Sequence, residues 1–410
     1  MPELPHIRYL YVVHEVFRHK RISAAAEAVH LSQPAATQSL ARIEEQLGVQ
    51  LFEREPKGMV PTEAGRIFER RLTRTLEHLR RGDSLARKKA GRSEGGRPQG
   101  AFHRHCSPVQ LRALLAIART GSFNQAAQQL GVSQPGVHRA VRELAQLSGL
   151  TLFDQTRGGV VLTSAAEAFV HQLRLAVSEF QQAVYEINEY LNRDITQINV
   201  GSLPLSRASI LPQAIGALLD EVGAGVQVNC VDARYPTLLR ELRFGELDCI
   251  IGALRFPKPA NDVEQEVLFE DELAVIAAPD HPLLQKGHVT LEDTLGYPWV
   301  APPKEAPSGA YLFDTLRIQE RPNSPVRIVS SSLVLTRGLM ARGPYISLAS
   351  KRQIAADVAA GHLAVLPVPL EASGRAIGLT FRSGWAPTPL QSRFLDIVRA
   401  TAARGDMAAN

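Results

Sequence analysis

The chain contains one internal repeat. Residues 22–65 align without gaps with residues 123–166, at an offset of 101, and 12 of the 44 aligned positions are identical. The identical positions include the triplet Ser32–Pro34, which recurs as Ser133–Pro135. Two copies at this distance do not make a solenoid, in which many short repeats share a continuous core. The repeat therefore predicts one small domain that is used twice.

Each copy has the pattern of three helices followed by a β-hairpin. The first helix carries an apolar stripe, and the second is short and rich in small residues. Ser32 and Ser133 are suited to cap the third helix, and a proline follows in its first turn, where a missing N–H costs nothing. Two short β-prone runs come next, separated by a basic turn that contains glycine. This order predicts a winged helix-turn-helix, whose third helix fits the major groove of DNA.

Positive charge is concentrated in the half that contains the repeat. Residues 1–193 contain 26 Lys and Arg against 18 Asp and Glu, whereas residues 194–410 contain 20 against 23. A basic module joined to an acidic remainder indicates a chain that binds a polyanion through one part. Residues 66–104 are the most basic stretch. Their first part predicts a helix, and the Gly-rich part at 90–104 predicts a flexible tether that sets the spacing of the two copies.

The polar residues of the third helix are the candidates for reading DNA. Gln pairs well with adenine and Arg with guanine in the major groove, while basic residues further along reach phosphates. The predicted contacts of the first copy are Ser32, Gln33, Pro34, Thr37, Gln38, Arg42, Arg54 and Lys57. Those of the second copy are Ser133, Gln134, Pro135, His138, Arg139, Arg142 and Arg157. A helical hairpin used only for protein contact is the alternative.

Both copies resemble the DNA-binding domain of LysR-type transcriptional regulators. The resemblance is carried by AAAEAVHLSQPAATQSLARIEEQLGVQLFER and again by AAQQLGVSQPGVHRAVRELAQLSGLTLFD. The family ordinarily has one such domain in a chain, whereas this chain has two. Copy one has Lys20 where copy two has the more typical Gly121, and copy two has Gln155 in place of the basic Arg54. The resemblance implies binding to double-stranded promoter or operator DNA, and we expect both copies to bind.

Residues 164–192 predict a long helix with a single apolar stripe. They contain no Gly or Pro, and apolar residues recur in steps of three and four from Phe169 to Leu191. A stripe of this kind needs a surface to cover it. In the resembling family the equivalent helix pairs with its mate in a dimer. We therefore expect residues 164–193 to pair with a second copy of the chain, with packing on the chain's own domains as the alternative.

Residues 194–404 alternate strand-like and helix-like runs. This alternation predicts an open α/β sheet, and the length suffices for two lobes. The segment resembles the effector-binding domain of the same family, which is similar to periplasmic binding proteins. Its last segments resemble the branch that includes the galactose-binding-protein regulator. The resemblance implies a small-molecule effector between the lobes, an organic acid or a sugar-like compound, and a dimer or tetramer formed partly through this domain.

Candidate effector contacts follow the ends of predicted strands. Ligands of open α/β sheets lie at the carboxyl ends of strands, near helix N-termini. Hydroxyl groups and a guanidinium group suit a carboxylate or a polyhydroxylated ligand. The predicted contacts are Ser202, Leu203, Ser206, Arg207, Ser308, Ser330, Ser331 and Ser332. Helix capping is the alternative role of each serine.

The sequence contains no recognisable catalytic or metal-binding motif. GxxxxGK[ST], GxGxxG and HExxH do not occur. Cys106, Cys230 and Cys249 have neither disulfide-framework nor zinc spacing, and we expect Cys230 and Cys249 to be buried thiols. No apolar run has the length of a membrane span, and no secretory signal is recognisable. We therefore expect a cytoplasmic protein that needs no cofactor, metal or membrane.

These features predict a multidomain chain. It has winged helix-turn-helix domains at 5–62 and 106–163, a basic helix and linker at 63–105, a dimerisation helix at 164–193, and a two-lobed α/β domain at 194–404. The predicted function is a sequence-specific transcriptional regulator under effector control, and not an enzyme. One alternative is a DNA-architectural protein that bridges sites without a ligand. Another is a solute-binding module whose helical domains only assemble partners.

Overall fold

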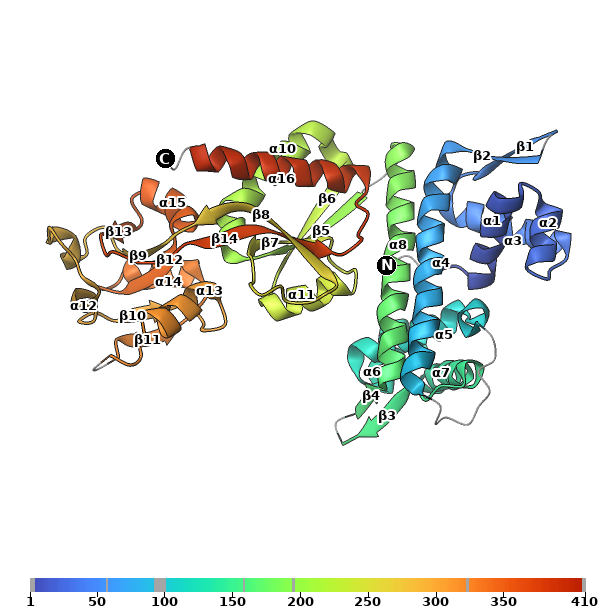
Figure 1. Ribbon diagram of the computed structural model, residues 1–410, viewed down its shortest axis with the longest axis horizontal. Coiled ribbons are helices and arrows are strands. Elements are labelled where there is room, and N and C mark those ends of the chain that lie inside the picture. The colour runs from blue at the N-terminus through green and yellow to red at the C-terminus, as the bar shows by residue number, and fades with distance from the viewer. Residues whose placement is uncertain are drawn as a thin grey trace. The chain divides into compact units, whose positions relative to one another are not determined.

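The computed structural model describes residues 4–56, 58–91, 101–157, 159–193, 196–321 and 324–407. The chain forms two compact units, which are Met1–Thr196 with Phe244–Glu246, and Gln197–Arg243 with Leu247–Asn410 (Figure 1). Residues 92–100 of the predicted tether lie outside the described residues.

Each copy of the repeat folds into three helices and an antiparallel hairpin, so the predicted winged helix-turn-helix is present twice. The first head contains α1 (Ile7–His19), α2 (Ile22–Ala28), α3 (Gln33–Leu47), β1 (Phe52–Glu55) and β2 (Gly58–Pro61). The second head contains α5 (Pro108–Thr120), α6 (Phe123–Leu130), α7 (Gln134–Ser148), β3 (Phe153–Thr156) and β4 (Gly159–Leu162). The predicted caps are confirmed, because Ser32 Oγ accepts a hydrogen bond from Ala35 N at 3.4 Å and Ser133 Oγ accepts one from Gly136 N at 3.3 Å.

The hairpin of each head is tied to the turn that follows its first helix. Met59 N donates to the Lys20 carbonyl at 2.9 Å, and Val160 N donates to the Gly121 carbonyl at 3.0 Å. Lys20 and Gly121 have positive φ angles of 55° and 65°. A Cβ atom makes this left-handed conformation costly. Lys20 therefore carries a backbone strain in the first head that Gly121 avoids at the equivalent place in the second.

Each hairpin leads into a long helix, capped by the threonine that precedes it. These helices are α4 (Glu63–Ala90) and α8 (Ser164–Tyr190). They lie side by side in Figure 1. They run antiparallel, because Phe68 packs edge-on against Phe180 whereas Gly82, later in α4, lies against Phe169, earlier in α8. The apolar stripe of α8 is thus covered by α4 of the same chain.

This pairing corrects the expectation that a second copy of the chain covers residues 164–193. The reason lies in the repeat, which gives the chain a second long helix with its own buried stripe that includes Leu72, Leu76 and Leu79. Two helices of one chain pair without the loss of translational freedom that association of separate chains requires.

A buried ion-pair network lies between α4 and α8. The Arg71 side chain is 4% exposed, and its Nη1 lies 2.9 Å from Glu179 Oε2, while its Nη2 contacts Glu186. Burial opposes the charge of Glu179, but hydrogen bonds from Arg74 and Arg71 and the charges of these arginines hold the pKa of that carboxyl below its ordinary value. The acidic partners of Arg71 therefore lie on the opposite helix, and these polar contacts fix the register of α4 against α8.

The segment that enters the second head packs against α1 and α4 through two buried residues, Phe102 and His103. The 3-10 helix η1 (Phe102–His105) carries His103, which is 2% exposed. His103 Nδ1 lies 2.6 Å from Asp83 Oδ2 of α4, and its Nε2 lies 2.8 Å from Tyr11 Oη of α1. One core of buried residues runs through both heads, α4 and α8. The spacing of the heads therefore follows from this core, and not from the tether at 90–104 as the sequence suggested.

The second unit has two lobes, each built on a five-stranded sheet. The strand orders are β6-β5-β7-β14-β8 and β11-β10-β12-β9-β13. The elements of the first lobe are β5 (Thr196–Ser202), α9 (Pro204–Ala208), α10 (Ile210–Val222), η2 (Gly223–Gly225), β6 (Val226–Asp232), α11 (Tyr235–Arg243), β7 (Cys249–Ala253), β8 (Val263–Asp271), β14 (Arg375–Arg382) and α16 (Pro389–Met407).

The second lobe is inserted between β8 and β14, so the chain passes between the lobes twice. Its elements are β9 (Leu273–Ala277), η3 (Pro282–Gln285), α12 (Leu291–Thr294), β10 (Trp299–Ala301), α13 (Pro307–Ala310), η4 (Tyr311–Thr315), β11 (Val326–Val329), α14 (Leu333–Met340), β12 (Ile346–Ser350), α15 (Lys351–Ala359) and β13 (Ala364–Leu366). Separate apolar cores form around Phe394 in the first lobe and Trp299 in the second.

The cysteines differ in part from expectation. Cys249 lies in the inner strand β7 and is buried, and so is Cys106, whose pKa burial and the nearby Asp83 charge raise to about 12. Cys230 is exposed, because β6 is the edge strand of its sheet. Among the described residues, no helix combines the length and the apolar character needed to cross a bilayer.

We expect Lys20→Gly to raise the free energy of unfolding of the first unit by about 1 kcal/mol, because glycine adopts a positive φ without strain. The matched change Gly121→Lys is expected to lower it by a similar amount. Urea unfolding followed by circular dichroism measures both changes. The chain's two tryptophans, Trp299 and Trp385, lie in the second unit, so their fluorescence transition is the control and should not move. If Lys20→Gly and the parent have the same free energy of unfolding, the inference that the backbone of Lys20 is strained is wrong.

Arg71→Ala is expected to lower the free energy of unfolding of the first unit by about 3–5 kcal/mol, because it leaves two buried carboxylates without their main partner. The triple variant Arg71→Met/Glu179→Leu/Glu186→Leu should regain most of that loss, since no buried charge then lacks a counter-charge. The same unfolding experiment measures both. A loss of under about 1 kcal/mol in Arg71→Ala, the size of a surface ion pair, would show that the helix pair does not depend on this network.

Candidate nucleic-acid interface and ligand pocket

The third helix of each head has one buried and one exposed face. Leu40 and Ile43 of α3 are buried in the first head, as Val137 and Leu144 of α7 are in the second. The predicted DNA contacts lie on the opposite faces. Exposed positions among them are Ser32, Gln33, Pro34, Gln38, Arg42, Arg54, Ser133, Gln134, Pro135, His138, Arg139, Arg142 and Arg157, and Thr37 is half-buried. Lys57 lies outside the described residues.

Each exposed face begins at a capped helix N-terminus. The first turn presents backbone N–H groups and the positive end of the helix dipole, which favour a phosphate oxygen. Thr37 Oγ1 donates to the Gln33 carbonyl at 3.0 Å, so this hydroxyl is already engaged within the helix. Arg42 lies 3.1 Å from Glu45, an exposed ion pair that phosphate contact can replace at little cost.

The second head presents a different surface. The His138 ring stacks on Phe123 with a centroid distance of 3.9 Å and an interplanar angle of 9°. Its Nε2 also lies 3.5 Å from Gln134 Nε2, at the limit of a hydrogen bond. Arg139 and Arg142 extend from the same exposed face. The arrangement suits direct contact with base edges from α7, with the imidazole held in place by the phenyl ring.

The hairpins add basic groups beside each helix. Arg54 lies on β1 and Arg157 lies in the turn between β3 and β4, and both side chains are exposed. The position equivalent to Arg54 in the second head is Gln155, so the two wings offer positive charge at different points. Arg side chains at such positions are suited to phosphate groups that flank a groove.

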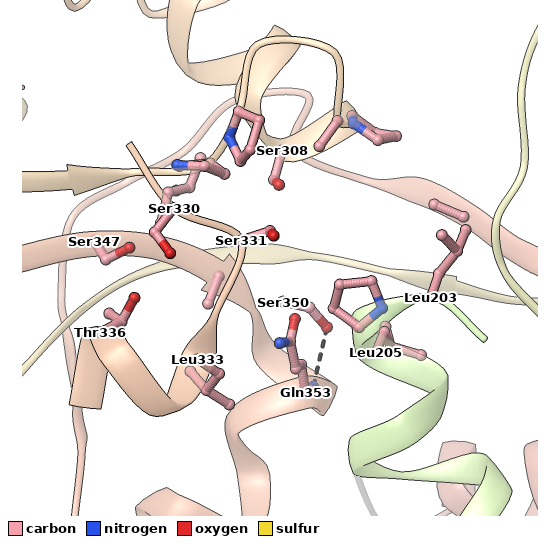
Figure 2. Close-up of a pocket in the computed structure, with 18 of the residues that line it drawn as sticks. Leu203, Leu205, Ser308, Ser330, Ser331, Leu333, Thr336, Ser347, Ser350 and Gln353 are labelled. Atoms are coloured by element: carbon pink, nitrogen blue, oxygen red, sulfur yellow. Dashed lines mark hydrogen bonds between the residues drawn. The ribbon is translucent and has the colours of Figure 1, made fainter. Parts of the chain in front are cut away.

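The second unit contains a cavity of about 120 Å³ between its lobes. The second lobe contributes the segments that follow β10 and β11, together with β12 and the start of α15. These three strands are mutually parallel, so their carboxyl ends lie at one edge of the sheet. Five of the predicted contacts line this cavity: Leu203, Ser308, Ser330, Ser331 and Ser332. Figure 2 shows the hydroxyl groups of Ser308, Ser330 and Ser331 on one side of the pocket, across from Leu203 and Leu205.

The structure does not bring Ser202, Ser206 and Arg207 into this lining. Ser202 Oγ donates to the Val231 carbonyl at 3.1 Å, and Ser206 Oγ donates to the Leu203 carbonyl at 2.8 Å, so both hydroxyls serve the backbone. Arg207 forms an ion pair with Asp232 outside the lining. The first turn of α9 directs Leu203 toward the cavity and these polar groups away from it.

Arg255 and Arg375 also line the pocket, and sequence analysis did not identify either of them. Arg255 follows β7, which is parallel to β5, so it lies at the same strand ends as Leu203. The end of a predicted strand was therefore a signal that could have found it. Arg375 begins β14, which is antiparallel to β7, and only the sheet topology brings the start of that strand to this edge.

The two arginines differ in how their charges are balanced. Arg375 Nη2 lies 3.2 Å from the buried Asp271. Arg255 donates to the Ala253 carbonyl at 2.9 Å and lies over the Tyr235 ring, and within the described residues it forms no ion pair. Burial, and to a smaller extent the nearby positive charge of Arg375, lowers the pKa of Arg255. A carboxylate placed beside Arg255 would offset both effects.

Two winged helix-turn-helix heads and a two-lobed ligand-binding unit define a DNA-binding protein with a regulatory domain. Family models described as "Bacterial regulatory helix-turn-helix protein, lysR family" match residues 7–66 and again 108–167. A model described as "LysR substrate binding domain" matches residues 192–403. The chain belongs to the LysR family of bacterial transcriptional regulators.

Relatives agree with this assignment. The HTH-type transcriptional regulator GalR of Pseudomonas putida is 30% identical over 400 residues, which cover 97% of each chain. PcaQ of Agrobacterium fabrum is 29% identical over 292 residues, 71% of this chain and 94% of its own. Both are named as transcriptional regulators and not as enzymes. The solved structure of a full-length OxyR variant from Pseudomonas aeruginosa is 23% identical, with a TM-score of 0.51 over 72% of this chain and 93% of its own. In the described part of the chain, no group of three His, Cys, Asp or Glu side chains could hold a metal ion.

We expect Arg255→Met to weaken the binding of small carboxylates by roughly tenfold or more, because it removes a guanidinium that forms no ion pair within the described part of the chain. The measurement is a thermal-shift and calorimetric titration of the full chain with a panel of mono- and dicarboxylates. Arg207→Met is the matched control and should bind like the parent, since Arg207 lies outside the cavity lining. A carboxylate that binds the parent and Arg255→Met equally well would exclude this role of Arg255.

Proposed function

We propose that this regulator reads DNA with both heads and is controlled by an organic acid bound between the lobes of residues 194–404. The observation that carries the ligand class is the pair of arginines in the cavity, Arg255 and Arg375. Among the described residues, only Arg375 of this pair has a carboxylate partner. Serine hydroxyls from the second lobe would bind the remaining polar groups of the ligand. A neutral sugar would leave the charge of Arg255 without an acidic partner.

In this proposal the exposed faces of α3 and α7 enter the major groove. Gln33 and Gln38 of the first head, and Gln134 and Arg139 of the second, are suited to base edges. The flanking basic residues Arg42, Arg54, Lys57, Arg142 and Arg157 are assigned to phosphates. The capped helix N-termini and the basic charge of residues 1–193 support this assignment.

We also propose that the chain self-associates, as a dimer or a tetramer, through residues 194–404. The stripe on residues 164–193 is covered by α4 and does not offer a second copy the expected surface. In the first lobe, Leu219 and Val222 of α10 are 42% and 37% exposed, and α10 packs beside the edge strand β6. An exposed apolar patch next to an open sheet edge is suited to a protein contact. The cytoplasm, where bacterial promoters are found, is the proposed location.

The effector would act by changing the relative populations of lobe arrangements. A ligand shifts such an equilibrium only by the difference in its affinity for the two arrangements. Arg255 lies on one lobe, and Ser308 and Ser331 lie on the other. A ligand that contacts all three residues at once has a higher affinity for the arrangement in which the lobes are closed around it. A change in the second unit would then alter how two associated chains place their heads on DNA.

The test is genome-wide DNA capture with the intact chain and two variants, Gln33→Ala/Gln38→Ala and Gln134→Ala/Arg139→Ala. We expect each variant to lose a different half of a composite motif, because the substitutions remove base contacts from one head only. Binding should also weaken steeply with rising salt, as phosphate contacts require. If the first variant captures the parental motif unchanged, the first head does not read bases. A DNA affinity that does not change with salt concentration would favour the alternative of a solute-binding module whose helical domains only assemble partners. The absence of any ligand-dependent thermal shift would favour a DNA-architectural protein that acts without a ligand.

A further inference from the structure

The pairing of α4 with α8 has approximate two-fold symmetry. The repeat offset relates residue 71 to residue 172 and residue 78 to residue 179. The contact between Arg71 and Glu179 is thus equivalent to a contact between Gln172 and His78, and that contact is present, with His78 Nδ1 2.9 Å from Gln172 Oε1. Exchanging the two helices therefore reproduces the pair of contacts. This is the geometry of an isologous interface, here formed inside one chain.

The two equivalent contacts are chemically different. One is an ion pair, and the other joins an amide to His78, whose pKa burial lowers. In the same geometry, two copies of α4 would set Arg71 against His78, with no carboxylate between them. Two copies of α8 would set Glu179 against Gln172, with no arginine. Only α4 with α8 gives the buried Arg71 its acids, and a buried charge without a partner is strongly destabilising. The network thus selects pairing between unlike helices.

The heads held by these helices present unlike surfaces. Equivalent exposed positions carry Gln38 and Arg139, Ala41 and Arg142, and Arg42 and Glu143. Glutamine is suited to adenine and arginine to guanine in the major groove. The second head therefore has two arginines where the first has a glutamine and an alanine, and an acid where the first has a base. The half-site that suits α3 does not suit α7.

We infer that each polypeptide reads an asymmetric operator, made of two different half-sites in one order and at one spacing. The order follows from the unlike recognition helices, and the spacing follows from the common core that holds the heads through α4 and α8. A dimer of identical heads reads a symmetric site. In this chain the two heads are held by a similar two-fold pairing of helices, but their recognition helices differ, so the site that they read is not symmetric. The inference rests on the proposed reading of DNA by both heads.

The first test is selection of binding sites from random DNA duplexes by the intact chain. The enriched motif is expected to contain two unlike half-sites in a fixed order and spacing. An insertion of about five base pairs between them, half a helical turn, should weaken binding by roughly tenfold or more, because one head then faces the wrong side of the duplex.

A head-matched variant provides the control. Gly136→Ala/His138→Thr/Arg139→Gln/Arg142→Ala/Glu143→Arg gives the first ten residues of α7 the exposed side chains of residues 33–42 of α3. The melting curve of this variant shows whether the fold is kept. This variant is expected to convert the motif into two identical half-sites at the parental spacing. A parental motif that is already symmetric, that contains one half-site, or that tolerates any spacing overturns the inference while leaving DNA reading in place. If the intact chain enriches no motif, the proposed function itself fails.

The second test asks whether both halves are read by one polypeptide. The variants Gln33→Ala/Gln38→Ala and Gln134→Ala/Arg139→Ala are unfolded together, refolded as an equimolar mixture, and titrated with the composite duplex. If each chain pairs its own α4 with its own α8, the mixture should bind no better than the separate variants. Recovery of a tight-binding fraction after joint refolding, but not after mixing of the separately refolded variants, would show that helices pair between chains and not only that chains associate through residues 194–404. That result would overturn the one-chain operator. Intact parent refolded in the same way must recover its full affinity.

Discussion

The burial of Arg71 between Glu179 and Glu186 is the interaction on which the first half of the molecule depends. It fixes which long helix pairs with which, and in what register. Once α4 covers α8, the two heads share one core, and the stripe that was expected to bind a second chain is no longer open. The self-association that we propose then falls to the second unit. A single ion network thus determines how the DNA-binding surfaces are placed and which surface remains for oligomer formation.

The second unit depends on a different constraint, the parallel arrangement of its strands. Parallel β10, β11 and β12 bring Ser308, Ser330–Ser332 and Ser350 to one edge. Parallel β5 and β7 bring Leu203 and Arg255 to the facing edge. Asp271 ends β8, where the chain leaves the first lobe, and Arg375 begins β14, where it returns. Their ion pair therefore joins the two places at which the chain crosses between the lobes. The cavity lies against that joint, so a ligand there contacts the part of the unit about which the lobes would move.

Local signals in the sequence were sufficient for the elements and for much of the candidate site. The serine caps, the proline in each first turn, the paired β-prone runs and the stripe on residues 164–192 each depend on neighbouring residues, and the structure contains the corresponding elements. Leu203 and the serines that follow strands of the second lobe were found from the same kind of signal. The hydroxyls of Ser202 and Ser206, which donate to backbone carbonyls, were not distinguishable from ligand contacts, because serines near strand ends take both roles.

What the sequence could not provide depends on which distant segments meet. The partner of the α8 stripe was misassigned because the stripe itself does not say whether its cover is another chain or another part of the same one. His103 has no acid near it in the sequence, because Asp83 is brought to it only by the fold. Arg375 reaches the pocket through antiparallel pairing with β7, which no local pattern reveals. The exposure of Cys230 likewise follows from the place of β6 at a sheet edge.

The unlike heads also have a consequence for how such a regulator changes over generations. When a regulator is a pair of identical chains, one mutation in the recognition helix alters both half-sites at once, and the operator must acquire two matching changes. Here a substitution in α7 leaves α3 untouched, because the two helices are encoded separately. If both heads read DNA as proposed, promoter and protein can diverge one base contact at a time while the other head keeps its contacts with the DNA.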